Sequence, residues 1–161
     1  MARHSDSRSL PHTAGQMFDL VADIESYPRF LPWCSSACIH SRTTMDTCDL
    51  VDADLVISFK VHRERFRSRA TLHHGKEWIS IAYLDGPMSH MDSSWEFAPE
   101  ASGCNVRFKI DYEFRSRVLR SLVSVVFAEA MQRIVRSFEN RAYAIYGPPP
   151  QNPSTELQDR A

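Results

Sequence analysis

Several features that would assign a chain to a class of proteins are missing from this 161-residue sequence. It contains no run of 18 apolar residues, so it predicts no membrane-spanning helix. Residues 1–6 contain no apolar segment, and we expect no secretory signal. The net charge of −1 provides no overall positive field for nucleic acid. Four cysteines in a chain of this length do not suggest a disulfide framework, and we expect reduced thiols in a cytoplasmic protein.

Short motifs for catalysis and metal binding are also missing. The sequence contains no Gly-rich phosphate loop, no G-x-S-x-G and no H-E-x-x-H. Cys34 and Cys38 lack a second pair at a spacing suited to zinc, and the seven histidines are scattered. These absences predict a protein that is not an enzyme, with no catalytic residue, no metal site and no cofactor.

The longest pattern that the sequence does contain is a segment with helical periodicity, residues 116–146. Neither proline nor glycine interrupts it, and Gly147 followed by Pro148 is a stop signal. Its apolar side chains recur at the three- and four-residue spacing of one buried helix face. They are Leu119, Leu122, Val123, Val126, Phe127, Ala130, Met131, Ile134, Val135, Phe138, Ala142 and Ile145. The pattern predicts a long amphipathic helix that lies across a sheet.

Between residues 35 and 114 the apolar residues alternate with polar ones. Six such runs, separated by short turns, cover residues 37–45, 55–61, 66–72, 79–83, 91–97 and 106–114. Alternation with period two predicts antiparallel strands with one buried face. Upstream, residues 3–10 predict an edge strand that ends at Pro11. Two short helices are expected over residues 14–22, with Thr13 as N-cap, and over residues 24–27.

The predicted fold class is therefore α+β. An antiparallel sheet of six to seven strands would curl around the long C-terminal helix, with two short helices near the N-terminus. With 43% hydrophobic residues, residues 1–147 can bury the core of one domain. The Pro-rich, polar residues 148–161 are expected to form a disordered tail. Periodicity leaves open whether sheet and helix close on each other or enclose an apolar cavity.

A short string of aromatic residues and prolines, residues 27–34 (YPRFLPWC), precedes the first strand of the meander. Two prolines four residues apart cannot lie inside one regular helix or a central strand. One interpretation is a packed corner of the core. The other is the mouth of a cavity, because the prolines hold aromatic residues on a connection that the meander does not need. The amphipathic rings of Tyr27 and Trp33 would suit lipid uptake at a membrane interface.

This string resembles the YPxFLPWC signature of the coenzyme Q-binding family, whose members have the START-like helix-grip fold of the polyketide cyclase/START superfamily. The family includes bacterial ribosome-association toxins. Residues 20–23, 84–87 and 138–147 also fit the family, so the resemblance covers roughly residues 10–147. Met88 stands where the family more often has an aromatic residue.

The resemblance implies non-enzymatic binding of ubiquinone or a similar hydrophobic isoprenoid lipid, as a carrier or chaperone that supports respiration. An alternative is a ribosome-association regulator, since some bacterial members are described as acting on the large ribosomal subunit. A second alternative is a cyclase-type enzyme, because related helix-grip proteins place an acid or base in the cavity. The predicted inward rows, however, contain Ser68, Ser93 and Tyr112 but no Asp, Glu or His.

The expected partners follow from the same resemblance. The first is a hydrophobic quinone or lipid, together with peripheral contact to the inner membrane. The alternative partner is the large ribosomal subunit. No binding to DNA is expected.

A ligand of this kind needs a dry cavity with few polar groups. The side chains expected to line it come from the aromatic string, the inward rows of the strands and the long helix. They are Phe30, Leu31, Trp33, Met91, Trp95, Phe108, Phe127, Met131, Val135 and Phe138. We expect Trp33 to guard the mouth and Met91 and Met131 to adapt to the ligand. The helix residues also have a simpler interpretation as ordinary core.

The only concentrated positive feature is a row of four arginines, Arg63, Arg65, Arg67 and Arg69. Period two places all four on the outer face of one strand. They can pair across strands with acids such as Asp52 or Asp54. Alternatively they contact RNA phosphate or anionic lipid headgroups. Aromatic residues do not alternate with them on that face, so no base-stacking platform is predicted.

Overall fold

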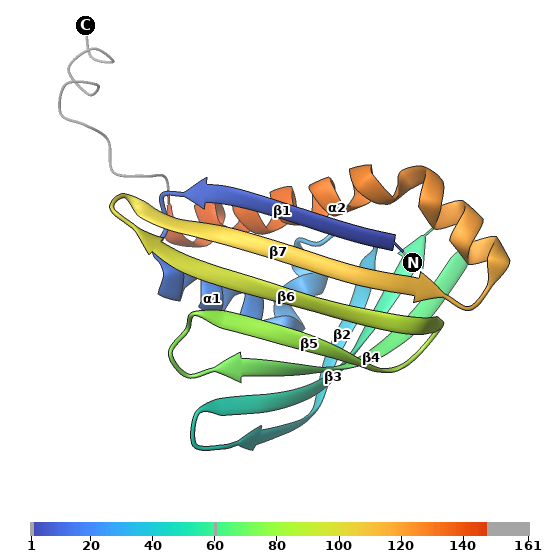
Figure 1. Cartoon of the computed structure of the whole chain (residues 1–161), viewed down its shortest axis with the longest axis horizontal. Helices are drawn as coiled ribbons and strands as arrows, with labels where there is room; N and C mark the ends of the chain where they lie inside the picture. The colour runs from blue at the N-terminus through green and yellow to red at the C-terminus, as the bar shows by residue number, and fades with distance from the viewer. Residues whose placement is uncertain (1, 60, 148–161) are drawn as a thin grey trace, which may run out of the picture.

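The computed structural model describes residues 2–59 and 61–147 (Figure 1). The predicted disordered tail, residues 148–161, lies outside these residues. Within them the chain forms seven strands, two α-helices and one 3₁₀ helix. In order these are β1 (Ala2–Leu10), α1 (Ala14–Ala22), η1 (Ile24–Arg29), β2 (Cys34–Thr44), β3 (Cys48–Phe59), β4 (His62–His73), β5 (Trp78–Asp85), β6 (Met88–Glu100), β7 (Gly103–Phe114) and α2 (Arg117–Tyr146). The predicted α+β class and order of elements are confirmed.

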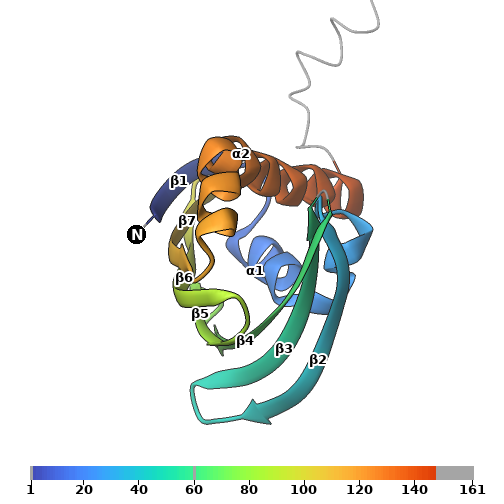
Figure 2. The same cartoon turned by 90° about the vertical axis from the view of Figure 1, so that its right-hand side faces the viewer.

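The seven strands form one antiparallel sheet in the order β1-β7-β6-β5-β4-β3-β2. Strands β2 to β7 are a meander, and β1 occupies the edge beside β7, with Leu10 opposite Cys104. Figure 2 shows that the sheet curves from β1 round to β2 and that α2 crosses the open side of this curve. The helix therefore faces the concave side of the sheet, as the sequence predicts.

Local chemistry explains where the helices begin and end. Ser116 accepts a hydrogen bond from the backbone N–H of Leu119 and so caps the start of α2. Gly147 follows its last residue with φ at 84°, a left-handed conformation that favours glycine, and donates to the carbonyl of Tyr143 at 2.9 Å. Helix α1 begins at the predicted cap Thr13, which forms a reciprocal capping box with Gln16.

The second short helix is longer than predicted and is a 3₁₀ helix. It runs over Ile24–Arg29 and includes Pro28. Proline has a φ that suits a helix but lacks a donor, and it is tolerated in such a short piece because few intrahelical bonds are lost.

The turn between β6 and β7 holds the edge strand in place. Gly103 has φ at 155°, and a Cβ at this position would overlap the carbonyl oxygen of Leu10. Only glycine permits this close approach of two backbones. The end of β1 is therefore fixed against the start of β7.

The core divides into two clusters along α2. The larger one contains Trp95, whose ring centroid lies 5.0 Å from that of Phe138 and 4.6 Å from that of Phe108. The smaller one contains Met88, Tyr112, Phe114 and Leu119 near the start of α2. Among the described residues, neither helix is long and apolar enough to cross a membrane.

Candidate functional site

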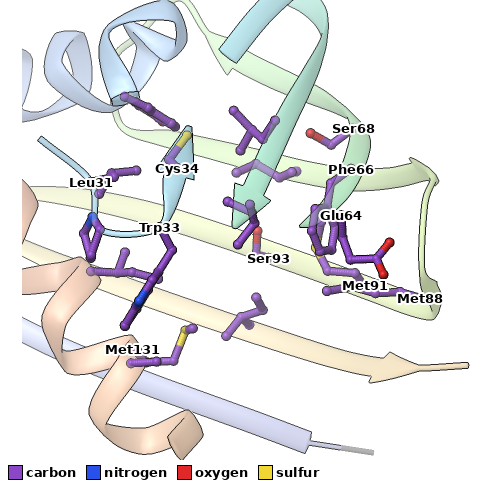
Figure 3. A pocket seen from close by; sticks show the side chains of 18 of the residues that line it. Leu31, Trp33, Cys34, Glu64, Phe66, Ser68, Met88, Met91, Ser93 and Met131 are labelled. Atoms are coloured by element: carbon purple, nitrogen blue, oxygen red, sulfur yellow. The ribbon is translucent and has the colours of Figure 1, made fainter. Parts of the chain in front are cut away.

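A cavity of about 340 Å³ lies between α2 and the concave face of the sheet (Figure 3). Its walls are the inward rows of β3 to β7, the connection at residues 27–34 and one side of α2. Almost all of these side chains are aliphatic, aromatic or thioether groups. The sheet and the helix therefore border an apolar cavity, a point that periodicity alone left open.

The cavity has a deep end and a partly exposed end. At the deep end, Ile79 is 1% exposed, Val21 and Ala53 are 2% exposed and Trp95 is 4% exposed. Four other lining residues, on the side of the β3–β4 hairpin, are only half-buried: Trp33, Phe59, His62 and Glu64. Leu122 and Met131 on α2 also line the cavity and are half-buried, so this gradient indicates an entrance between the hairpin and α2.

Seven of the ten residues expected at the site line this cavity. They are Leu31, Trp33, Met91, Trp95, Phe108, Met131 and Phe138. Figure 3 shows Leu31 and Trp33 near Met131, while Met91 lies farther along the sheet. The structure thus gathers side chains from the connection, the sheet and the helix around one space. That they bind a ligand stays a prediction.

The other three expected residues do not line the cavity. Phe30 packs on the ring of Phe138 at 5.3 Å, with the Arg141 guanidinium 5.4 Å from its own ring centroid. Phe127 belongs to the smaller cluster, 4.4 Å from the ring of Tyr112. Val135 is buried in the larger cluster. The apolar stripe of α2 is wider than the cavity, so part of it packs on the sheet beside the cavity.

Two polar lining residues were missed by the sequence analysis. His62 and Glu64 lie on the inward row of β4, which continues through Phe66 and Ser68. The prediction that no Asp, Glu or His faces inward is therefore wrong. The signal was present, because the period-two row that begins at Phe66 extends back to residues 64 and 62. Ser93 also lines the cavity as predicted, whereas Tyr112 is buried in the smaller cluster.

The backbone at the entrance is held in an unusual conformation. Trp33 has φ at 66°, in the left-handed region that costs a non-glycine residue on the order of 1–3 kcal/mol. Its carbonyl accepts a hydrogen bond from the Ser58 N–H at 2.7 Å. Its ring packs edge-to-face on the ring of Phe59, with 5.7 Å between the ring centroids. These contacts to the end of β3 hold Trp33 at the cavity wall.

Two other polar groups of the aromatic string are unreactive. The hydroxyl of Tyr27 donates to the carbonyl of Val21, and burial raises the pKa of Tyr27 well above its usual value. Burial also raises the pKa of the Cys34 thiol. Both groups therefore stay protonated, and neither provides a nucleophile to the cavity.

The row of arginines lies on the outer face of β4 and is largely neutralised there. Asp54 Oδ2 lies 2.7 Å from Arg65 Nε, and Asp54 Oδ1 lies 2.9 Å from Arg67 Nε. Asp52 is bound by Arg69 at 2.8 Å. The hydrogen bond from Arg67 lowers the pKa of Asp54 to about 2. The predicted pairing across strands is confirmed for these three arginines, whereas contact with RNA or headgroups stays a prediction.

Chemistry based on metal ions finds no support in the described part of the chain. Residues 2–59 and 61–147 contain no group of three or more His, Cys, Asp or Glu side chains placed to hold a metal ion. The four cysteines are free thiols. The candidate site is thus an apolar cavity with a few polar groups.

Comparison with known proteins gives the same fold and two kinds of relative. Residues 10–139 match the family described as polyketide cyclase / dehydrase and lipid transport. The chain is 33% identical to the ribosome association toxin RatA of Rickettsia prowazekii over 145 residues, covering 88% of this chain and 97% of the toxin. It is 32% identical to the coenzyme Q-binding protein COQ10 homolog B, mitochondrial, of Xenopus laevis, covering 89% of this chain and 59% of that protein.

A solved structure supports the same architecture. The START superfamily protein from Mycobacterium smegmatis superposes with a TM-score of 0.74 at 15% identity, over 89% of this chain and 98% of that one. At this identity the match concerns the fold alone. It confirms the START-like helix-grip arrangement.

Proposed function

Since this chain belongs to the polyketide cyclase / dehydrase and lipid transport family, we propose that it binds ubiquinone or a similar isoprenoid lipid in the cavity under α2. In this role it would act as a carrier or chaperone, without catalysis. The observation that carries the proposal is the apolar cavity of about 340 Å³, which a fully packed core would not contain.

The cavity suits such a ligand in size and chemistry. Small-molecule sites typically measure about 300–1,000 Å³ and are mostly apolar with a few placed polar groups. Each CH₂ of a ligand tail that leaves water contributes about 0.8 kcal/mol. Met88, Met91 and Met131 contribute flexible thioethers to the wall, and such side chains repack easily around varied ligands.

Exposed apolar side chains on the β3–β4 hairpin and on α2 suit peripheral contact with a membrane. Val61 at the tip of the β3–β4 hairpin is 94% exposed, and Val125 on α2 is 84% exposed. A lipid could pass from the inner membrane into the cavity without crossing water if these residues rest on the surface. The proposal therefore includes a cytoplasmic location with a peripheral contact to the membrane.

Catalysis is not part of the proposal even though Glu64 and His62 line the cavity. A catalytic base is normally oriented by a partner. Within residues 2–59 and 61–147, the side chains of Glu64 and His62 make no hydrogen bond or ion pair. Two unoriented groups at the entrance fit ligand recognition better than acid–base chemistry.

Ribosome association is the second candidate function. It is favoured by the similarity to a ribosome association toxin over nearly the whole chain. Asp54 and Asp52 pair with Arg65, Arg67 and Arg69, so these two acids reduce, without cancelling, the positive charge that the four arginines offer to RNA. The two candidates therefore differ in which part of the molecule acts, the cavity or another surface.

One pair of substitutions tests the cavity. Met131→Gln puts an amide into the cavity wall, whereas Met17→Gln puts the same amide into the core, where Met17 is 1% exposed. An unpaired buried amide costs roughly 1–3 kcal/mol. We expect Met17→Gln to lower the free energy of unfolding by that amount. We expect Met131→Gln to lower it less, because water in the empty cavity can pair with the amide, and to weaken ubiquinone binding about tenfold.

The readouts are denaturant unfolding of ligand-free protein, titration with a short-chain ubiquinone, and mass spectrometry of lipids extracted from purified protein. Equal losses of stability with unchanged binding would show that Met131 is ordinary core. Wild-type protein that retains no quinone or isoprenoid lipid would contradict the proposal. Co-sedimentation of such protein with large ribosomal subunits would then support the second candidate.

A further inference from the structure

The polar groups of the cavity are not spread evenly over its wall. Glu64 and His62 lie two residues apart on the inward row of β4, both half-buried on the entrance side. Figure 3 shows the Glu64 carboxylate beside Phe66 and Met88, at the end of the cavity opposite Leu31. The deep end around Ile79 and Trp95 contains no charged side chain among the described lining residues, and the buried Ser93 contributes a hydroxyl there.

The side chain of Glu64 makes no polar contact that would stabilise the fold. Across the described ranges 2–59 and 61–147 it makes no hydrogen bond or ion pair. Its strand partner across the sheet is Ile57, whose side chain also lines the cavity. The outward acid Asp54 on the next strand, by contrast, is held by two arginines. A carboxylate that faces apolar side chains without a partner loses solvation and gains nothing from the protein.

A carboxylate can only accept hydrogen bonds, and the carbonyl oxygens of a quinone can also only accept them. Two acceptors that face each other repel. A hydroquinone or a prenol, in contrast, carries an O–H that donates. We infer that Glu64 is a specificity-determining residue that selects ligands with a hydroxyl group on an apolar body, and so favours the hydroquinone over the quinone. His62, which can donate or accept, lies beside it on the same row.

This inference rests on the proposed function and adds an orientation to it. The hydroxyl-bearing head lies at the entrance beside Glu64, and the apolar tail points toward Trp95. Such an arrangement pairs Glu64, the one acid among the described residues of the cavity wall, with the polar head of the ligand. A hydrogen bond to a charged group is strong enough to change affinity about tenfold or more.

The test compares matched ligands that differ in the two hydrogen atoms of a hydroquinone or in one methyl group. The first pair is a short-chain ubiquinol and its ubiquinone, titrated without oxygen. The second pair is farnesol and its methyl ether, which separates a prenol from a hydroquinone as the source of the hydroxyl. We expect wild-type protein to bind the hydroxyl form of at least one pair about tenfold more tightly.

Substitutions of Glu64 then assign the preference to this residue. In Glu64→Leu the preference should fall to less than about twofold. In Glu64→Gln the amide N–H₂ can donate to a quinone carbonyl, so binding of the quinone should improve. Glu96→Gln is the control, because Glu96 lies exposed on β6 and pairs weakly with Arg107 at 3.6 Å. It should leave the preference unchanged.

The outcomes separate this inference from the proposed function. Equal binding of both members of each pair by wild-type protein would overturn the inference while the cavity-binding proposal stands. A preference that survives in Glu64→Leu would also overturn it. Binding of none of the four ligands would reject both. Melting temperatures of each variant identify loss of folding, and Glu64→Gln, which preserves size, provides a second variant if Glu64→Leu does not fold.

Discussion

The two faces of strand β4 differ in whether their charged side chains form ion pairs. On the outer face, Arg65, Arg67 and Arg69 are paired with Asp54 and Asp52 of β3. On the inner face, Glu64 lines an apolar cavity and has no partner among the described residues. Both faces belong to one twelve-residue strand with a strict period of two. Three of the four outer arginines already pair with acids of the neighbouring strand, whereas the inner carboxylate pairs with no described residue.

This difference bears on where function lies. Charges that already pair within the protein contribute to the sheet and offer little to a partner. A polar group that the fold leaves unpaired is a candidate for recognition, because its cost must be offset elsewhere. By this criterion the cavity wall is the better candidate for the proposed function, although the arginines are more conspicuous in the sequence.

The largest loss of stability is expected from a substitution on the inner face of β4, where the strand is packed. Leu72 is 5% exposed and lines the deep part of the cavity. Leu72→Ala should lower the free energy of unfolding by about 2–5 kcal/mol. We expect a value near the lower end of this range, because one side of Leu72 already borders the cavity. Denaturant unfolding measures it. A cost below about 1 kcal/mol would mean that the inner face is not packed around the cavity.

On the outer face, Asp54 is expected to make a smaller contribution to stability, and this contribution depends on pH. The pKa of Asp54 is lowered to about 2 by its hydrogen bond from Arg67, below the ordinary value of an unfolded aspartate, about 3.9. The folded protein therefore binds fewer protons at this group than the unfolded chain. The stabilisation is complete above about pH 5 and is lost as the pH falls toward 2.

The measurement is the difference in melting temperature between wild type and Asp54→Asn. We expect wild type to be more stable at neutral pH and the difference to shrink between about pH 4 and pH 2. Asp92→Asn is the control for losing a carboxylate, because Asp92 is on β6 and makes no ion pair within the described residues. A difference that does not vary with pH would show that Asp54 is not held as an ion pair.

The smallest effect is expected from Arg63, the member of the row that makes no ion pair within the described part of the chain. Arg63→Ala should change the free energy of unfolding by less than about 0.5 kcal/mol, as is usual for an exposed side chain without contacts. Arg67→Ala should cost more, because Asp54 then loses a partner. If both substitutions had the same effect, the pairing on the outer face would contribute nothing to stability.

The architecture could be predicted because its signals are local and repeated. Helix α2 has no internal proline or glycine and stops at Gly147, and the strands alternate with period two. The edge position of β1 follows from Pro11 and its polar composition. The pairing of β1 with β7 is a contact between distant residues, and no local pattern contains it.

The site could be predicted only in part, for three physical reasons. Phe127 and Val135 share the apolar stripe of α2 with Met131, and spacing does not tell which part of the stripe meets the cavity. Phe30 packs on the ring of Phe138 instead of lining the cavity, and this partner lies more than a hundred residues later in the chain. Glu64 was within reach of the sequence, because extending one alternating row by two residues would have placed it inward.

The pairing of the first strand with the last has a consequence for how the chain is made. A ribosome adds roughly 5–20 residues per second, so β1 waits on the order of 5–20 seconds before β7 is available to pair with it. Helix α2 follows later still. During this interval the meander exposes its concave apolar face without the helix that will cover it. The nascent chain therefore exposes the apolar face that will line the cavity as an open sheet before the cavity exists, and lipids or chaperones nearby could reach that face first.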